Sequence, residues 1–283
     1  MLIRQIALVS QTNKISSSGL SRVGAALQKQ TTRDLAPIWQ IKATVDTFAR
    51  LSDVPIGYWP IIITEQDLGD AAGIHEDKQG QPFALVHYSY GWSLTASHEC
   101  LEMLVDPFGN RLLAGQSLMA DQGRVEYLVE VCDPSEDDAF AYRVNGILVS
   151  DFYTPDFFEP ELTSGTRYSF TRAITAPRQV LKGGYISWHD PVSDHWFQQI
   201  YFDDQPSFRD LGQLTARPLE NLRALLYRHT PERSSAKKAE FKGALTKAAR
   251  SSMADHEQAA EARAKALESR ISEVIDDYSP SPA

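Results

Sequence analysis

The chain has 283 residues, of which 42% are hydrophobic, and a formal net charge of −9. This length and composition are typical of a globular protein that buries a sizeable core, in one large domain or two smaller ones. Acidic and basic residues balance beyond residue 230, so the net charge lies in the first 230 residues. Neither part has the basic face that nucleic-acid binding requires, and we predict no nucleic-acid partner.

The hydrophobic runs and the cysteine content indicate which class of protein this is and in which compartment it is expected. No run approaches the roughly 20 apolar residues that a membrane helix needs, so no membrane association is expected. The N-terminal apolar run lacks a cleavage-site pattern and is expected to be a first strand rather than a signal peptide. Cys100 and Cys132 provide no disulfide framework, which favours a reducing, cytoplasmic location.

The first 110 residues alternate between predicted strands and helices. Apolar runs and period-2 alternation predict strands, in chain order, at residues 3–10, 39–45, 59–64 and 82–89. A helix capped by Ser18 or Ser21 is expected after the first strand and must end near Pro37. The polar, glycine-bearing stretch 67–81 is predicted to be a loop. A second helix is predicted to begin near Ser93, directly after the fourth strand.

The chain beyond residue 110 has a different pattern. Alternation of apolar and polar residues predicts a strand at 124–132, and the Asn145-Gly146 step predicts a hairpin turn. Residues 151–195 are rich in aromatic residues, proline and glycine, and are expected to form loops and short strands.

The C-terminal part is predicted to be helical. A helix is expected from Pro218 to about His229, since proline is favoured in the first turn. Residues 234–276 are rich in alanine, lysine and glutamate, which suits a long exposed helix or a coiled coil.

The stretch from Trp92 to Asn110 has the highest density of side chains that can bind a metal or transfer a proton. In a helix, His98 and Glu102 project from one face a single turn apart, with Glu99 as their neighbour. Buried carboxylates require partners, and a histidine grouped with carboxylates is the pattern of a functional site. We therefore predict a divalent metal site on this helix.

The residues from His98 to Glu102, HECLE, resemble the zincin metallopeptidases, whose signature is His-Glu-x-x-His on a helix. In that family two ligands one turn apart hold Zn²⁺, and the glutamate after the first ligand takes a proton from metal-bound water. The resemblance implies His98 and Glu102 as ligands and Glu99 as the general base. The order of elements over residues 1–110 is also similar to the zincin N-terminal half. There a strand lines the substrate cleft, the place taken here by residues 82–89.

Glu102 departs from the family pattern, which has a second histidine at this position. A carboxylate ligand adds negative charge, which lowers the Lewis acidity of the metal and favours harder cations. Zn²⁺ is therefore the first expected ion, with Mn²⁺ and Ca²⁺ as alternatives. No His-x-x-Gly-x-x-His extension follows, so the metzincin branch is not matched.

A third ligand must come from another segment. Asp106 is eight residues beyond His98, about 12 Å along a straight helix, which is too far to share one ion unless the helix breaks early. Its expected partner is a loop backbone, an arginine or a second cation. Glu130, Asp133 and Glu136 are offered by the strand 124–132 and the turn after it. Glu130 or Asp133 is the predicted third ligand, and the sequence leaves the choice open.

These features predict an α+β fold: a zincin-like N-terminal half with a mixed sheet and an active-site helix at about 93–106, an irregular β-rich second half, and a long C-terminal helical tail. The predicted metal-binding domain spans 1–215, β-rich from about 111, and the tail spans 216–283 and offers an oligomerisation surface.

The predicted function is hydrolysis of peptide or amide bonds, in a peptide or protein substrate, by metal-activated water. The alternative is a catalytically inactive zincin-like fold, with a structural metal or none, that serves as a protein-binding or assembly module. An open coordination position favours the enzyme, and four protein ligands favour the structural site.

Overall fold

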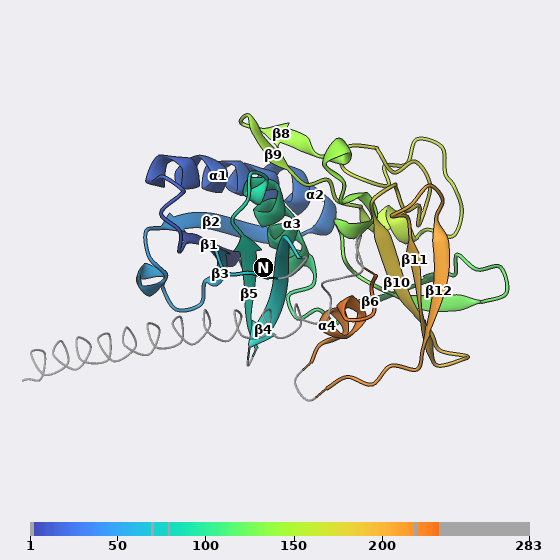
Figure 1. The fold of residues 1–283 in the computed structure, drawn as a ribbon. Helices are drawn as coiled ribbons and strands as arrows, with labels where there is room; N and C mark the ends of the chain where they lie inside the picture. The colour runs from blue at the N-terminus through green and yellow to red at the C-terminus, as the bar shows by residue number, and fades with distance from the viewer. Residues whose placement is uncertain (1–2, 69–70, 79, 218–219, 232–283) are drawn as a thin grey trace, which may run out of the picture.

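The computed structural model describes residues 3–68, 71–78, 80–217 and 220–231. Its two main sheets lie in different halves of the molecule, one built from the N-terminal strands and one from the strands after residue 111 (Figure 1). The chain crosses from one half to the other after α3 (Trp92–Val105). This crossing is where the candidate site is found.

The N-terminal sheet has five strands in the order β2-β1-β3-β5-β4, and β4 alone runs antiparallel to its neighbour. Its strands are β1 (Ile3–Ser10), β2 (Lys42–Phe48), β3 (Trp59–Thr64), β4 (Gly73–Lys78) and β5 (Gln81–His87). In β1, Ile6 and Leu8 belong to one core cluster and Ala7 and Val9 to another. Both faces of the strand are therefore buried, which explains its continuous apolar run.

Helices cover one face of this sheet. They are α1 (Ser17–Lys29), a π-helical turn (Gln30–Leu35) that continues into α2 (Ala36–Trp39), and α3. Apolar side chains of α1 and α3 share the core cluster that contains Ile6 and Leu8. Ser16 caps α1 by accepting a hydrogen bond from the Gly19 N–H, so the predicted cap at Ser18 or Ser21 was wrong. Pro37 lies in the first turn of α2, and the helix ends at Trp39.

Residues 73–78 form an edge strand where the sequence predicted a loop. The strand is polar, and in it Ile74 and His75 are the buried residues, because an edge strand exposes much of its surface and tolerates charge. β5 pairs with both β3 and β4, so the strand predicted at 82–89 lies inside the sheet and ends at His87. The sheet edge near α3 therefore belongs to β4.

The second half contains a five-stranded antiparallel sheet in the order β12-β11-β10-β7-β6. Its strands are β6 (Leu112–Gln116), β7 (Arg124–Leu128), β10 (Tyr185–Asp190), β11 (His195–Ile200) and β12 (Ser207–Gly212). β7 ends at Leu128, earlier than predicted, and the Val129 N–H still donates to the carbonyl of Arg111 next to the last strand pair. The hairpin of β8 (Tyr142–Val144) and β9 (Ile147–Val149) confirms the predicted turn, with positive φ at Asn145 and Gly146. Short 3₁₀ turns occur at Leu51–Asp53, Asp133–Ser135, Asp138–Phe140 and Pro155–Phe158.

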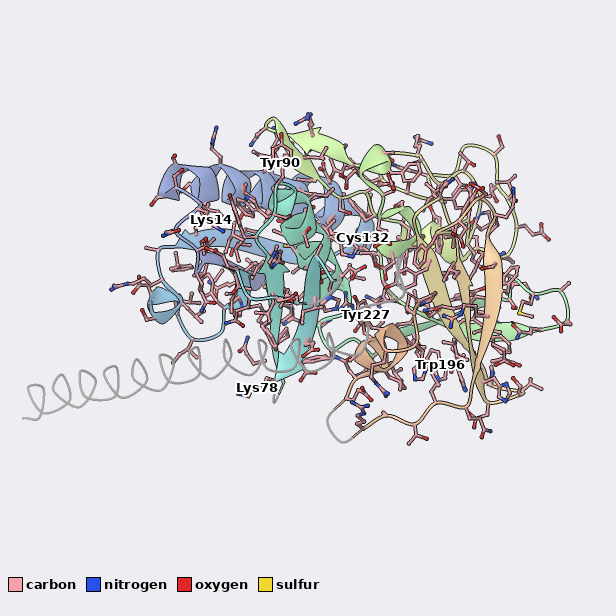
Figure 2. The ribbon with its side chains drawn as sticks, viewed as in Figure 1. Lys14, Lys78, Tyr90, Cys132, Trp196 and Tyr227 are labelled. Atoms are coloured by element: carbon pink, nitrogen blue, oxygen red, sulfur yellow. The ribbon has the colours of Figure 1, made fainter. Side chains whose placement is uncertain are left out.

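A short helix, α4 (Leu222–Tyr227), contacts both halves of the molecule. Leu226 packs with Leu128 and Trp196 of the second sheet, and Tyr227 packs against the core cluster on the other face of the first sheet. Figure 2 shows Tyr227 on α4 and Cys132 between the two halves. The helix begins later than predicted, after the cap Asn221, whose side chain accepts from the Ala224 N–H at 2.8 Å.

The predicted α+β fold class is wrong. Strand residues outnumber helical ones, helices are few, and the described part of the chain contains no long C-terminal helix. The second half, predicted to be irregular and β-rich, contains a five-stranded antiparallel sheet, and long loops connect its strands. The mixed N-terminal sheet is the part of the prediction that is found. Residues 220–231 of the predicted tail contact the body, and 232–283 lie outside the described residues. Among the described residues, no helix has the length and apolar character needed to cross a membrane.

Candidate metal centre

The helix α3 places His98, Glu99 and Glu102 at the boundary between the two halves. It ends at Val105 because Pro107 cannot continue it. The Asp106 carboxylate accepts hydrogen bonds from the backbone N–H groups of the next loop, one of them from Arg111 at 2.8 Å. Of the three partners predicted for Asp106, which were a loop backbone, an arginine and a second cation, the structure shows the loop backbone. The Asp106 carboxylate lies apart from the cluster described below.

The chain after β7 brings two further carboxylates to α3. Glu130 precedes and Asp133 begins the 3₁₀ turn Asp133–Ser135, in which Pro134 occupies the first turn. The N–H of Cys132, between them, donates to Glu102 Oε1 at 3.2 Å. This bond fixes the segment against the helix, so that Glu130 and Asp133 both face Glu102.

His98 lies between two carboxylates. Its Nε2 is 3.4 Å from Glu102 Oε1 and 3.1 Å from Asp133 Oδ1. Ligand atoms around a tetrahedral Zn²⁺ with bonds of about 2.0–2.2 Å are separated by about 3.3–3.6 Å. Asp133 Oδ2 has no hydrogen-bond partner among the described residues, although Asp133 is only 2% exposed. The donor types and these two separations from His98 Nε2 are those of ligands around a divalent cation.

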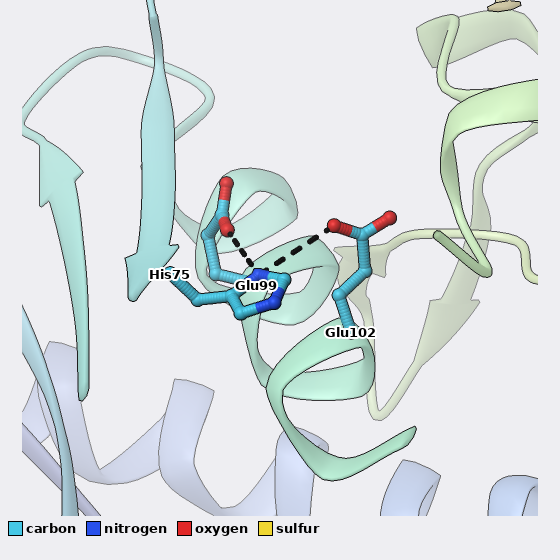
Figure 3. A group of neighbouring side chains, drawn as sticks. All are labelled: His75, Glu99 and Glu102. Carbon is cyan, nitrogen blue, oxygen red and sulfur yellow. Dashed lines mark hydrogen bonds and ion pairs between the residues drawn. The ribbon is translucent and has the colours of Figure 1, made fainter. Parts of the chain in front are cut away.

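His75 forms a second group with Glu99 and Glu102 (Figure 3). Its Nδ1 lies 3.3 Å from Glu99 Oε2 and 3.7 Å from Glu102 Oε2. All three side chains are at most 3% exposed. Glu102 therefore faces His98 with one oxygen and His75 with the other, which makes it the central residue of the cluster.

Arg223 of α4 completes the cluster. Its Nη2 lies 3.4 Å from both Glu99 Oε2 and Glu102 Oε2, and its Nε lies 3.3 Å from Glu130 Oε1. The same guanidinium donates to the backbone carbonyl of His75 on β4. Although burial opposes its charge, Glu99 and Glu102 hold the pKa of Arg223 well above its usual range. The cluster thus contains a permanent cation.

Burial and neighbouring charges set the protonation of the other members. Burial alone would lower the pKa of His98, but Glu102, Cys132 and Asp133 together raise it well above its usual value. Burial opposes ionisation of Glu99, yet Arg223 and His75 hold its pKa below the usual value. Without a metal, His98 is therefore protonated and Glu99 ionised at neutral pH.

Glu130 and Asp133 differ in protonation. Burial, followed by the nearby Asp133 carboxylate, raises the pKa of Glu130 well above its usual value. Burial also opposes the charge of Asp133, but the hydrogen bond and charge of His98 hold its pKa low. Asp133 is thus the better ligand of the two, because a metal ligand must be deprotonated.

Gly184 shapes the position of Asp133. A Cβ at residue 184 would lie 2.4 Å from the carbonyl oxygen of Asp133 and 2.7 Å from the backbone of Pro134. Because backbone atoms cannot yield as a flexible side chain can, Gly184→Ala is expected to shift the turn and to lower the free energy of unfolding by about 1–3 kcal/mol. Urea unfolding measures this, with Gly123→Ala as control, where a Cβ meets no atom within 4 Å. Equal stability of the two variants would contradict the expected clash.

Glu76, next to His75 on β4, predicts a pH dependence of stability. Burial raises its pKa to about 7 in the folded protein. A carboxyl group whose pKa is higher in the folded than in the unfolded state stabilises the fold while it is protonated. This contribution to the free energy of unfolding is fully present below the unfolded-state pKa of about 4.3 and is lost as the pH rises through 7. Glu76→Gln cannot ionise, so its stability relative to wild type should increase between pH 5 and 8. Because Glu76 is half-buried, about 3 kcal/mol is an upper limit for this change in the stability difference between the variant and the wild type. A gap between the two urea curves that is the same at pH 5 and pH 8 would refute this.

The structure brings together every predicted site residue. His98 contacts both Glu102 and Asp133, and Glu130 lies against Arg223. Glu136 joins His98 and Asp133 in a group whose ligand atoms lie within 4.8 Å of one another. Glu99 lies on the His75 side of Glu102. Buried histidine, glutamate and aspartate groups that can hold a metal ion are therefore present in this protein.

Sequence reasoning missed His75 and Arg223. His75 lies in the stretch that was predicted to be a loop, and no local pattern marks it. Arg223 carried a usable signal, because it shares one face of the helix with Leu226 and Tyr227 at spacings of three and four residues. An arginine on an apolar helical face predicts a buried ionic partner.

No match to this chain was found among protein-family models, among curated proteins, or among solved structures.

Proposed function

We propose that the protein is a metal-dependent hydrolase of peptide or amide bonds, with His98, Glu102 and Asp133 as the ligands of one divalent ion. The observation that carries the proposal is the Nε2 atom of His98, which faces an oxygen of both carboxylates at 3.4 and 3.1 Å. A single N–H cannot satisfy two acceptors well, whereas a cation beside Nε2 would draw on both carboxylates. Zn²⁺ is the first candidate, followed by Mn²⁺ and Ca²⁺.

Hydrolysis also requires a general base and access of water to the metal ion, and residues of the cluster supply both. When bound, the ion would act as a Lewis acid on a carbonyl group and lower the pKa of water. Glu99 is ionised and can accept a proton, the role that the resemblance of HECLE to the zincin signature implies. The His98 side chain is 14% exposed while Glu102 is fully buried, so solvent meets the cluster along His98.

A second candidate function is a closed metal centre that joins the two halves of a protein-binding or assembly module. It is favoured by Arg223, which hydrogen-bonds Glu99 and Glu102 and occupies space beside the proposed base. The ligands also come from both halves, α3 on one side and the segment after β7 on the other. A closed centre of this kind stabilises the fold without turnover.

The test is elemental analysis of the purified full chain, beside the variants His98→Ala and Asp133→Ala. About one divalent ion per chain in the wild type, lost in both variants, is the expected result. His189→Ala is the matched control, because His189 also contacts two carboxylates, Glu126 and Asp194, on the second sheet. Absence of metal from wild type reconstituted with Zn²⁺, Mn²⁺ and Ca²⁺ would refute the site.

The two candidates are separated by incubating the metal-loaded protein with a mixture of fluorogenic peptides. Cleavage that EDTA abolishes supports the hydrolase, whereas bound metal that raises the melting temperature without cleavage supports the closed centre. A peptide or protein substrate and a cytoplasmic location belong to the same proposal. Both cysteines, Cys100 and Cys132, are free and buried.

A further inference from the structure

The ring of His75 is oriented by the end of α3. Its Nε2 lies 3.2 Å from the carbonyl oxygen of Asp106, which can only accept, so Nε2 carries a hydrogen. Nδ1 is then the atom that the ring presents to Glu99 Oε2 and Glu102 Oε2 (Figure 3). A histidine that donates one ring N–H to a backbone carbonyl and directs the other nitrogen at carboxylates has the arrangement of an oriented metal ligand.

The guanidinium of Arg223 lies against the two carboxylate oxygens that the His75 ring faces. Its Nη2 is 3.4 Å from the same two oxygens, Glu99 Oε2 and Glu102 Oε2, that face the His75 ring. These contacts are longer than the usual 2.7–2.9 Å or so of a charge-assisted hydrogen bond. Among the described residues, Arg223 Nε also lacks a hydrogen-bond acceptor, although Glu130 Oε1 is 3.3 Å away. A side chain that is 7% exposed thus points a partly satisfied cation into the group.

The two oxygens of Glu102 face different cation positions. Oε1 faces His98, where the metal is proposed, and Oε2 faces His75 and Arg223. A carboxylate that directs its two oxygens at two cations is suited to bridge a pair of metal ions, which lie about 3.5–4 Å apart in two-metal sites. In this protein, the guanidinium of Arg223 takes the place of the second metal ion.

We propose that Arg223 is a built-in cation in a second cation position, formed by His75 Nδ1, Glu99 Oε2 and Glu102 Oε2. Its removal uncovers a site that takes a divalent metal ion, bridged by Glu102 to the first. The inference deepens the proposed function and rests on it for the identity of the first site alone. In this inference, the role of Arg223 is to limit the centre to one bound metal ion.

The experiment measures metal stoichiometry in the full chain. Wild type, Arg223→Met, Arg223→Lys and Arg223→Met/His75→Ala are stripped with EDTA, dialysed against Mn²⁺ and analysed for bound manganese. We expect one equivalent in the wild type and in Arg223→Lys, which retains a cation. Arg223→Met should bind two and show the electron paramagnetic resonance spectrum of an exchange-coupled Mn²⁺ pair. The double variant should return to one equivalent.

The outcome that overturns the inference is an unchanged stoichiometry in Arg223→Met. A second equivalent that persists after His75→Ala would overturn it too, because the added ion would then lie elsewhere. Failure of the proposed function has a different signature. Wild type would then bind no Mn²⁺, while Arg223→Met would bind one equivalent that is lost with His75→Ala and kept with His98→Ala.

Loss of Arg223 leaves Glu99, Glu102 and Glu130 without their guanidinium, so the single variant can fail to fold. Arg223→Met/Glu130→Gln removes one acidic group while keeping His75, Glu99 and Glu102. It is expected to show the same gain of one Mn²⁺ equivalent. Mn²⁺ should also raise its melting temperature more than that of the wild type, since a second bound ion stabilises the folded state. Equal shifts in the two proteins would count against the second position.

Discussion

Replacing Glu102 by alanine is expected to destabilise the protein by about 3–5 kcal/mol and to abolish metal retention. This carboxylate accepts from the Cys132 N–H and faces His98, His75 and Arg223. Its removal leaves a buried guanidinium with less compensating charge and a backbone N–H without its acceptor, and each of these losses is costly.

Urea unfolding in EDTA measures the structural part of the Glu102→Ala effect, and repetition with Zn²⁺ measures the metal-dependent part. Glu126→Ala is the control, because Glu126 also pairs with a histidine but its side chain is 45% exposed. Exposed pairs of this kind contribute about 0–1 kcal/mol. If the two variants lose similar stability in EDTA, the buried cluster does not contribute the stability that its contacts indicate.

The second large effect concerns Glu99. In the metal-loaded protein, Glu99→Gln is expected to lower peptide turnover by about 10²–10⁴-fold, because an amide cannot accept the proton that a carboxylate takes. Glutamine has nearly the same shape and still accepts from Arg223, whose Nη2 lies 3.4 Å from Glu99 Oε2. The fold and the bound metal at His98 should therefore persist, as circular dichroism and elemental analysis would establish.

The matched control for Glu99→Gln is Glu126→Gln, which makes the same chemical change on the second sheet. Its turnover should equal that of the wild type. Retained turnover in Glu99→Gln, with metal bound, would remove Glu99 from the reaction. Loss of both turnover and metal would show that Glu99 supports the site structurally through His75 and Arg223.

The sequence predicted the part of the site that one helix and one turn provide. His98, Glu99 and Glu102 share a face through the geometry of α3 alone, and the step from Asp133 to Pro134 marks a turn locally. The choice between Glu130 and Asp133 required the structure, because both lie near Glu102. The difference lies in their neighbours: His98 contacts Asp133, whereas Arg223 contacts Glu130.

The remainder of the fold and site depends on pairings between distant segments. β4 was missed because its pairing with β5, rather than an apolar run of its own, makes it a strand. The second half was predicted to be irregular and β-rich, and its sheet was not recognised because its strands are short and are joined by long loops rich in proline and glycine. Arg223 could not be assigned to the site from spacing, since α4 reaches it only after the second sheet is complete.

The position of Arg223 late in the chain has a consequence for the order of folding. Its contact with the carbonyl of His75 joins residues 148 positions apart, and closing so long a loop has a large entropic cost. Contacts of this separation form late, and a chain emerging from the ribosome presents α3 and the segment after β7 before α4. In that interval the carboxylates of Glu99 and Glu102 meet without their guanidinium. A metal ion bound at that stage by His98, Glu102 and Asp133, as proposed above, would be in place before Arg223 reaches Glu99 and Glu102.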